Sequence, residues 1–307
     1  MIDERLFPAA PPQRLAALRI VMGAAALIDV AIRSVGLVTA VGHPAWQFRG
    51  VGVLAWSSAP PTLASVIAAL VVSVVGGGAF VLGWRHRVSA PLFAFALLWL
   101  LSFRNSWGMV FHTENLMVLH VVLLAIAPAA DAWSLDARRR GDAVDGVARV
   151  RYGAPIRLLA LVTVVTYAIA GVSKLRASGW RWVTGDTLRN LVAFDNLRKA
   201  ELGDAYSALG VALVPYGAIF VGLAAVSLAV ELGAPLALLH ARVGRWWCAA
   251  AWGFHVGVVA LMWIGFPYQL FGVAYAPFFS LEQPLARVAA RWRDRSGSQR
   301  GRASERR

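Results

Sequence analysis

Three kinds of residue are scarce in this sequence, and the first two scarcities each exclude a class of protein. Cys248 is the single cysteine among 307 residues, so the chain can form no intrachain disulfide and no paired-thiol redox centre. Charged residues make up 15% of the chain and hydrophobic residues 59%, a composition too apolar for an ordinary soluble domain. Lysine is rare as well, because the 30 basic residues include only Lys174 and Lys199.

The sequence contains several long runs of apolar residues. Runs of about 18 or more apolar residues predict membrane-spanning helices, so we expect an all-α, polytopic membrane protein. We expect about eight transmembrane helices, plus an interfacial amphipathic helix at residues 186–201 in which apolar residues recur between charges. The expected spans are Leu15–Val41, Thr62–Trp84, Ala90–Phe103, Asn115–Ala130, Ile156–Leu175, Leu213–His240, Trp246–Ile264 and Tyr268–Leu281.

The charges lie mainly between the spans and near the ends of the chain. We expect a polar lead at residues 1–14, a transmembrane domain at 15–281 and a basic, disordered tail at 282–307. A net charge of +14 distributed in this way indicates contact with anionic lipid headgroups and argues against binding to nucleic acid. Because basic loops stay in the cytoplasm, their alternation predicts a multi-pass protein of the cell (inner) membrane with both termini cytoplasmic.

The stretch around Lys174 is the first candidate for chemistry. The fifth expected span ends on this lysine, and Trp180 and Trp182 follow closely. A cation at the end of a span, beside interfacial aromatic residues, serves either as an anchor or as a working group. Both interpretations stay open at this stage, although the rarity of lysine favours a chemical role.

Three further ionisable residues can approach Lys174. On the expected topology His112 enters its span at the membrane face where Lys174 exits, with Glu231 and His255 within reach. His255 also fits an ordinary packing role, and Glu231 also fits an ion pair with a neighbouring arginine. His112 and His120 are eight residues apart without a suitably spaced carboxylate or thiol, so we predict no metal site.

Several motifs resemble, in the same order, the membrane part of the vitamin K-dependent gamma-glutamyl carboxylase. A lysine motif is followed by W-V-x-G, a later Phe-His pair by Ile-Gly and an end rich in Pro and Phe, and an Asn-His region by WS-x-D. This pattern resembles the HTTM domain, the carboxylase-like membrane module that is also found in bacteria. The corresponding segments are AGVSKL at 170–175, WVTG at 182–185, residues 254–279, the region around His112 and Asn115, and WSLD at 133–136.

The resemblance implies a membrane enzyme, a quinone-dependent oxidoreductase or carboxylase-like protein, that uses a reduced, vitamin K-like quinone. The family's lysine, understood as the base that deprotonates the reduced quinone, corresponds to Lys174. The histidine of the Asn-His region corresponds to His112, which would bond the quinone oxygen or the lysine. Residues that would line the quinone pocket are Asn115, Trp180, Trp182, Glu231 and His255.

Two other functions remain open from the sequence. A non-catalytic accessory protein would hold a quinone or lipid without turnover. A transporter is suggested by Glu231 and by Asp29 and Arg33, although the last two stand four apart and also fit an intrahelical pair. In the carboxylase a large lumenal domain follows the membrane part, and we expect this chain to lack a counterpart of it. The expected partners are therefore membrane lipids, a hydrophobic quinone-type ligand and a protein that supplies such a domain.

Overall fold

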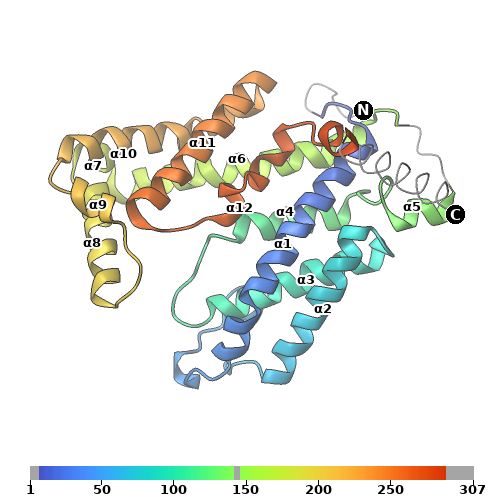
Figure 1. Cartoon of the computed structure of the whole chain (residues 1–307), viewed down its shortest axis with the longest axis horizontal. Coiled ribbons are helices and arrows are strands. Elements are labelled where there is room, and N and C mark those ends of the chain that lie inside the picture. The colour runs from blue at the N-terminus through green and yellow to red at the C-terminus, as the bar shows by residue number, and fades with distance from the viewer. Residues whose placement is uncertain (1–6, 142–145, 288–307) are drawn as a thin grey trace, which may run out of the picture. The chain divides into compact units, whose positions relative to one another are not determined.

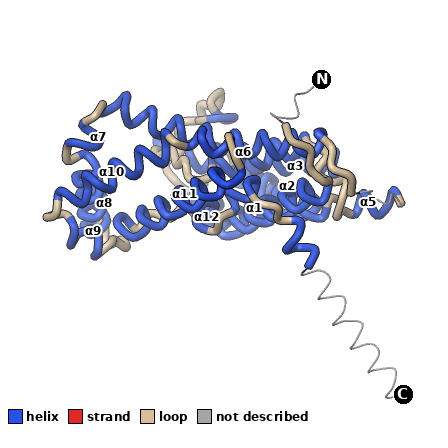
Figure 2. The backbone as a smooth tube through the Cα atoms, turned by 90° about the horizontal axis from the view of Figure 1, so that it is seen from above, coloured by secondary structure: helices blue, strands red, loops and turns tan. Residues whose placement is uncertain are grey.

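A computed structural model of the chain describes residues 7–141 and 146–287. Figure 2 shows that helices make up the regular structure of this described part, and the all-α prediction is confirmed. Most of the predicted disordered tail, residues 288–307, and the first six residues of the predicted polar lead lie outside the described residues.

Two compact units divide the chain. The first comprises residues 1–110, 121–157 and 279–307, and the second comprises residues 111–120 and 158–278. Two helices, α4 (Asn115–Ile126) and α6 (Val150–Ser178), contribute residues to both units.

In the first unit, three long apolar helices pack side by side, coloured blue to teal in Figure 1. The first starts with Pro12, whose missing N–H is one that a first helical turn leaves unpaired anyway. The second starts after Thr62, whose hydroxyl accepts a hydrogen bond from the Ser65 N–H, and ends at Gly83 in the left-handed conformation, with φ 62°. The elements of this unit are α1 (Pro12–Ala40), η1 (Ala45–Gln47), η2 (Gly52–Leu54), α2 (Leu63–Leu82), α3 (His86–Asn105) and α5 (Leu135–Arg140).

A buried arginine ties α1 to the segment that precedes α5. The side chain of Arg19 is completely buried, and its guanidinium donates hydrogen bonds to the carbonyl oxygens of Ala129 and Trp133, each at 2.6 Å. Burying a charge costs free energy unless it is hydrogen-bonded, and these carbonyls supply that compensation. Arg19 is therefore a structural residue that fixes residues 129–133 against the first helix.

The WSLD segment has a structural role in the same region. The Ser134 hydroxyl accepts a hydrogen bond from the Ala137 N–H at 2.9 Å and so caps α5. The carboxylate of Asp136 accepts hydrogen bonds from the N–H groups of Arg85 and His86, both at 2.8 Å, at the start of α3. This motif therefore joins two helix N-termini within the first unit.

The second unit is built around α6, α10 and α11. Its shorter helices connect these three, with α7 and α8 packing on α10, and α8 and α9 packing on the end of α11. The helices from α6 to α11 are coloured lime to orange in Figure 1. Its further elements are α7 (Arg181–Thr184), α8 (Thr187–Glu201), α9 (Ala208–Leu213), α10 (Gly217–Leu232), η3 (Ala234–Leu238), α11 (Ala241–Met262), α12 (Pro267–Leu270) and η4 (Val273–Phe278).

Four helices of the described residues are long and apolar enough to cross a membrane: α1, α2, α3 and α6. The amphipathic helix expected at 186–201 is present as α8, and α11 covers most of the expected seventh span. The other expected spans correspond to shorter helices, because α4 has 12 residues and α10 has 16.

Two of the expected spans are interrupted by proline and glycine. The region 213–240 contains the end of α9, then Pro215, and then α10, since proline cannot donate the backbone hydrogen bond that a continuous helix requires. The region 268–281 forms only short helical turns, because Gly272 takes a left-handed φ of 74° and Pro277 lies shortly after it. A single membrane-length helix is thus absent from each of these two described regions.

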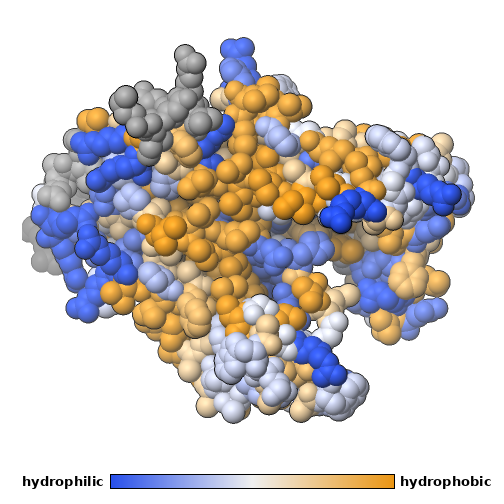
Figure 3. All heavy atoms as spheres, turned by 180° about the vertical axis from the view of Figure 1, so that it is seen from behind, coloured by the Kyte–Doolittle hydropathy of each residue, from blue (hydrophilic) through white to orange (hydrophobic). Residues whose placement is uncertain are grey.

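Large apolar side chains are exposed in both units. Examples are Ile32 (76% exposed) and Val35 (72%) in the first unit, and Ile169 (60%) and Val226 (61%) in the second. Figure 3 shows such apolar side chains over a broad area of the face in view. Exposure on this scale indicates contact with lipid, and the chain is a membrane protein.

Candidate functional site

Lys174 is paired with Glu231 inside the second unit. The Nζ atom of Lys174, on α6, lies 2.6 Å from Oε1 of Glu231, on α10. The side chain of Glu231 is only 4% exposed and that of Lys174 is 21% exposed. A carboxylate buried to this degree needs a neighbouring cation and a hydrogen-bond donor, and the Lys174 ammonium is both.

A glycine makes this close approach possible. A Cβ atom on Gly171 would come within 2.9 Å of Cδ2 of Leu232 and 3.0 Å of Cβ of Glu231. Gly171 lies three residues before Lys174, and therefore on the same face of α6. The AGVSKL segment thus combines a small residue that admits α10 with the lysine that binds it.

Two aromatic rings flank the Lys174 ammonium. Its Nζ atom lies 4.8 Å from the ring centroid of Trp182 and 5.4 Å from that of Phe254. Cation–π contacts of this kind contribute about 0.5–2 kcal/mol, with the larger values where water is excluded. Trp182 is itself buried against Ala224 and Leu228 of α10, so its ring is held in place beside the lysine.

A chain of hydrogen bonds lies beside the ion pair. The Tyr167 hydroxyl, on α6, lies 2.7 Å from Nε2 of His255, on α11, and 2.7 Å from the Tyr275 hydroxyl, on η4. Trp247 packs edge-on against Tyr167, with ring centroids 5.1 Å apart. His255 is 5% exposed, and Lys174 lies near enough to act on it electrostatically.

His112 reaches the same group of residues through an aromatic neighbour. Its ring centroid lies 5.7 Å from that of Phe266, which in turn lies 4.8 Å from that of His255. His112 is exposed, whereas His255 is buried. The structure thus brings together four residues that the sequence analysis selected, namely Lys174, Glu231, His255 and His112.

The amphipathic helix α8 is fixed to the end of α11. Three successive carbonyls of α11 each accept a hydrogen bond from a side chain of this region, because the last carbonyls of a helix lack partners within the helix. Ser207 donates to the Ala260 oxygen, Asn196 to the Leu261 oxygen at 2.9 Å, and Lys199 to the Met262 oxygen. The second lysine of the chain is therefore a helix cap.

Comparison with known protein families places the chain in one of them. The HTTM domain family matches residues 7–282, which is most of the chain. The protein belongs to the HTTM domain family. This domain is related to the membrane region of the gamma-carboxylase. No curated protein and no solved structure matches the chain significantly.

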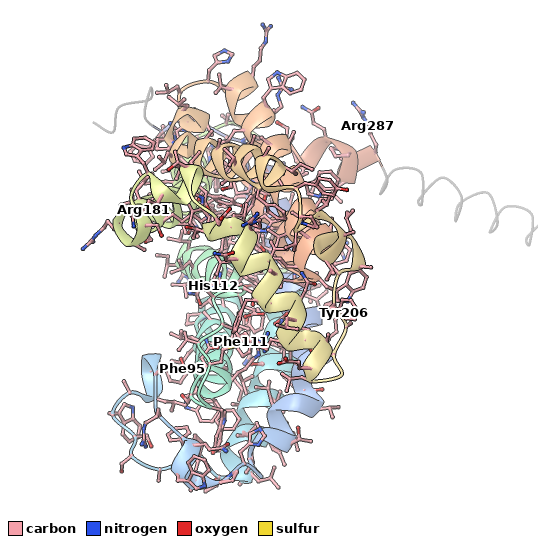
Figure 4. All side chains as sticks on the ribbon, turned by 90° about the vertical axis from the view of Figure 1, so that its left-hand side faces the viewer. Phe95, Phe111, His112, Arg181, Tyr206 and Arg287 are labelled. Carbon is pink, nitrogen blue, oxygen red and sulfur yellow. The ribbon has the colours of Figure 1, made fainter. Side chains whose placement is uncertain are left out.

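Two of the selected residues of this HTTM protein lie outside the cluster around Lys174. Trp180 is 73% exposed, whereas Trp182, two residues later, is 8% exposed and contacts the lysine. Arg181, between them, points outward in Figure 4. Asn115 is exposed at the start of α4, where its N–H donates to the His112 carbonyl at 3.3 Å.

Sequence reasoning missed three residues of the cluster around Lys174. Tyr167 precedes Lys174 by seven residues, or two helical turns, so helical spacing alone would have placed both on one face of α6. Phe254 did have a sequence signal, because it belongs to the Phe-His pair at 254–255. Tyr275 had no local signal, because its contact with Tyr167 depends on a return of the chain more than 100 residues later.

Two polar atoms of the cluster around Lys174 are left without a partner. Oε2 of Glu231 and Nδ1 of His255 are buried without hydrogen-bond partners. Buried polar atoms are normally paired, so both atoms are exceptions to the usual pattern. Among the residues that the structure describes, no group of three or more His, Cys, Asp or Glu side chains could hold a metal ion.

Proposed function

We propose that this protein is a membrane enzyme that takes a proton from a reduced, quinone-type ligand, with the Lys174–Glu231 pair as general base. The observation that carries the proposal is the 2.6 Å contact between Lys174 and Glu231 beneath the rings of Trp182 and Phe254. Such rings are the surfaces on which a flat aromatic ligand stacks, and the unpartnered oxygen of Glu231 is an acceptor for a hydroxyl group.

The base strength belongs to the pair and not to Lys174 alone. The hydrogen bond between Lys174 and Glu231 holds one proton between the amine and the carboxylate. When the pair takes up a second proton, it gains one positive charge. The faces of the Trp182 and Phe254 rings stabilise that charge, and burial keeps competing water away.

A reduced quinone, when bound, would supply a weakly acidic hydroxyl group and the electrons for an oxidation. The residues that would hold it are Trp182 and Phe254 through their rings, and Glu231 and His255 through their unpartnered atoms. His112 would meet the ligand from the exposed side of the cluster, next to Phe266. Asn115 and Trp180 would contribute only at the outer edge.

The experiment uses purified protein in nanodiscs, a reduced naphthoquinone and oxygen. Oxygen-dependent consumption of the naphthohydroquinone is compared among wild type, Lys174→Ala and Glu231→Gln, with empty nanodiscs as the measure of uncatalysed oxidation. Quenching of tryptophan fluorescence measures binding in the same samples. Trp182→Phe and the exposed Trp180→Phe form a matched pair, of which we expect only the first to weaken binding.

We expect turnover by the wild type, and a loss of about 10²-fold or more in folded Lys174→Ala, as is typical when a general base is removed. Binding without turnover in the wild type would contradict the enzyme proposal and favour an accessory protein that holds a quinone. An absence of binding would contradict both.

We further propose that the chain crosses the cell (inner) membrane eight times, with both termini in the cytoplasm. Support for the eighth crossing comes from α12 and η4, where irregular backbone is covered by protein, as a membrane requires. Ala274, Tyr275 and Ala276 are at most 4% exposed there.

In a Cys248→Ser background, Arg139→Cys and Trp56→Cys should react with impermeant thiol reagents from opposite sides of the membrane. Labelling of both from one side would contradict this topology.

A further inference from the structure

We propose that the turn between α2 and α3, together with α5, forms a binding site for one anionic phospholipid, with Trp84, Arg85 and Arg139 at its phosphate. The site belongs to the first unit and is independent of the function proposed for the Lys174–Glu231 pair. Three observations carry it: two arginines lie against one tryptophan ring, one of these arginines has a strained backbone, and exposed apolar side chains continue from the arginines along α3.

Asp136 brings the two parts of the site together. Its carboxylate accepts hydrogen bonds from the N–H groups of Arg85 and His86, both at 2.8 Å, and its own N–H donates to the Gly83 carbonyl at 3.0 Å. These bonds hold α5 beside the turn between α2 and α3 (Figure 1). Because each carboxylate oxygen bonds a backbone N–H group, Asp136 orders the site without forming an ion pair with Arg85 or Arg139.

Two guanidinium groups lie against the ring of Trp84. The Cζ atom of Arg85 is 5.5 Å from the ring centroid, and that of Arg139, on α5, is 5.9 Å from it. Both arginines are exposed, and neither forms an ion pair within the described part of the chain, unlike Arg140, whose guanidinium lies 3.7 Å from the Asp131 carboxylate. A guanidinium group over a ring can still direct its N–H groups at a phosphate, which it binds through two parallel hydrogen bonds.

The backbone of Arg85 has a conformation that glycine normally takes. Its φ is 46°, in the left-handed region where residues other than glycine are uncommon. Gly83, two residues earlier, has a φ of 62°, so the turn requires two such conformations and glycine occupies only one of them. Strained backbone of this kind is concentrated at binding and catalytic sites, which indicates a role for the Arg85 side chain.

Exposed apolar side chains continue from the arginines along the spans. Leu82, at the end of α2, is 57% exposed, and Val88 and Leu92, near the start of α3, are 59% and 51% exposed. Positions 85, 88 and 92 are spaced to lie on one side of α3. Because α2 and α3 are long and apolar enough to cross a membrane, the turn that joins them lies at a membrane surface. A lipid whose phosphate is at Arg85 would therefore extend its acyl chains along Val88 and Leu92.

A phospholipid is the kind of anion that uses both parts of this site. A soluble phosphate ester or a nucleic acid would contact the arginines and leave the exposed Val88 and Leu92 uncovered. A zwitterionic lipid would bring the cation of its headgroup close to Arg85 and Arg139, and like charges repel. We therefore expect a preference for phosphatidylglycerol, which carries one negative charge and no cation, over phosphatidylcholine.

The test measures lipid binding to the delipidated full-length protein in a non-ionic detergent by native mass spectrometry. Dioleoyl phosphatidylglycerol and dioleoyl phosphatidylcholine, which have the same acyl chains, are titrated separately, and the occupancy of the first bound lipid gives the apparent affinity. We expect the wild type to bind the anionic lipid about tenfold more tightly or better, because its charge-assisted hydrogen bonds are unopposed. Glycerophosphoglycerol, the same headgroup without chains, should fail to displace the lipid at equal concentration.

Three variants distinguish a built site from a general positive surface. Trp84→Leu keeps every charge and removes the ring, and Arg139→Gln removes one guanidinium group. We expect each to weaken the binding of phosphatidylglycerol by about fivefold or more. Arg242→Gln is the matched control, since Arg242 is an exposed arginine on α11 in the second unit. It should stay within about twofold of wild type, because a single exposed charge is largely screened by salt.

Two outcomes overturn the site in favour of general attraction to a basic surface. One is an equal loss of affinity in Arg139→Gln and Arg242→Gln, and the other is an unchanged affinity in folded Trp84→Leu. Equal binding of the two lipids, or displacement by glycerophosphoglycerol, overturns an anionic lipid as the occupant. Thermal unfolding shows whether each variant is folded, and the exposed position of Arg139 keeps the test decisive if Trp84→Leu does not fold.

Discussion

The Lys174 ammonium and the Glu231 carboxylate lie 2.6 Å apart between α6 and α10, and the carboxylate is almost completely buried. Removing one member leaves the other uncompensated in a poorly hydrated place, which typically costs about 3–5 kcal/mol. We therefore expect Lys174→Met and Glu231→Gln each to lower the free energy of unfolding by a few kcal/mol. The measurement is unfolding by SDS in mixed micelles.

The double variant Lys174→Met/Glu231→Gln tests the cause of that loss. Because it removes both charges, we expect it to be more stable than either single variant. Losses that simply add in the double variant would show that the two residues act independently and would contradict the pairing.

Gly171 should be as important to the site as the charged residues. Gly171→Leu places a side chain where even a Cβ atom would meet Leu232 and Glu231, so α10 must move away from Lys174. A displacement of about 1 Å at a reactive site can cost about 10²-fold in rate, and we expect naphthohydroquinone turnover to fall at least tenfold. Gly222→Leu is the matched control, since a Cβ atom at Gly222 has no neighbour within 4 Å.

The cap at the end of α11 predicts a purely structural effect. Asn196→Ala removes the donor to the Leu261 carbonyl and the acceptor for the Ser207 N–H, which lies 2.7 Å from the Asn196 side-chain oxygen. Leaving such buried groups unpaired costs about 1–3 kcal/mol. We expect the SDS unfolding midpoint to fall accordingly. The exposed Asn190→Ala on the same helix should leave it unchanged, and equal effects of the two would argue against the cap.

Asp136 predicts how stability depends on pH. Partial burial raises the pKa of Asp136, but the N–H donors of His86 and Arg85 and the nearby Arg140 together lower the pKa below its usual value. A lowered pKa in the folded state means that the carboxylate stabilises the fold above its unfolded pKa of about 4 and loses this effect as the pH falls through the folded value.

The corresponding measurement is the thermal midpoint of wild type and Asp136→Asn between pH 7 and pH 3. We expect the wild type to be the more stable at pH 7, and the difference to shrink in the acidic range. Glu201→Gln, at an exposed position, should show no such difference. A gap between wild type and Asp136→Asn that stays constant down to pH 3 would contradict the capping role.

Much of the fold could be predicted because apolar runs report directly on helices in a membrane protein. The first three spans and the amphipathic segment correspond closely to α1, α2, α3 and α8. The helices in the later part of the chain were harder to predict, because Pro215 and Pro277 interrupt runs whose hydrophobicity alone suggests continuous spans. Hydrophobicity reports burial or lipid contact, and it does not report whether the backbone can continue as a helix.

The candidate site, too, could be predicted only in part. Lys174, Glu231 and His255 were predicted because ionisable residues in apolar runs are costly and therefore conspicuous. The interpretation of Asp29 and Arg33 as an intrahelical pair agrees with the structure, in which Arg33 Nε lies 2.9 Å from both carboxylate oxygens. Of the two interpretations of Glu231, an approach to Lys174 or an ion pair with a neighbouring arginine, the structure shows the first. That choice depends on how α6 and α10 meet, which no local pattern records.

The cap on α11 has a consequence for whether the two lysines can be replaced by arginine. Lys199 places an ammonium at the negative end of the α11 helix dipole, where it offsets the partial charge of the last carbonyls. Lys199 also pairs with the Asp195 carboxylate at 2.8 Å, as Lys174 pairs with that of Glu231 at 2.6 Å. Both positions hold a compact ammonium, and the wide, planar guanidinium of arginine has a different shape and hydrogen-bonding geometry. In a chain that otherwise uses arginine throughout, these are the two sites where the commoner basic residue would be a disruptive substitution.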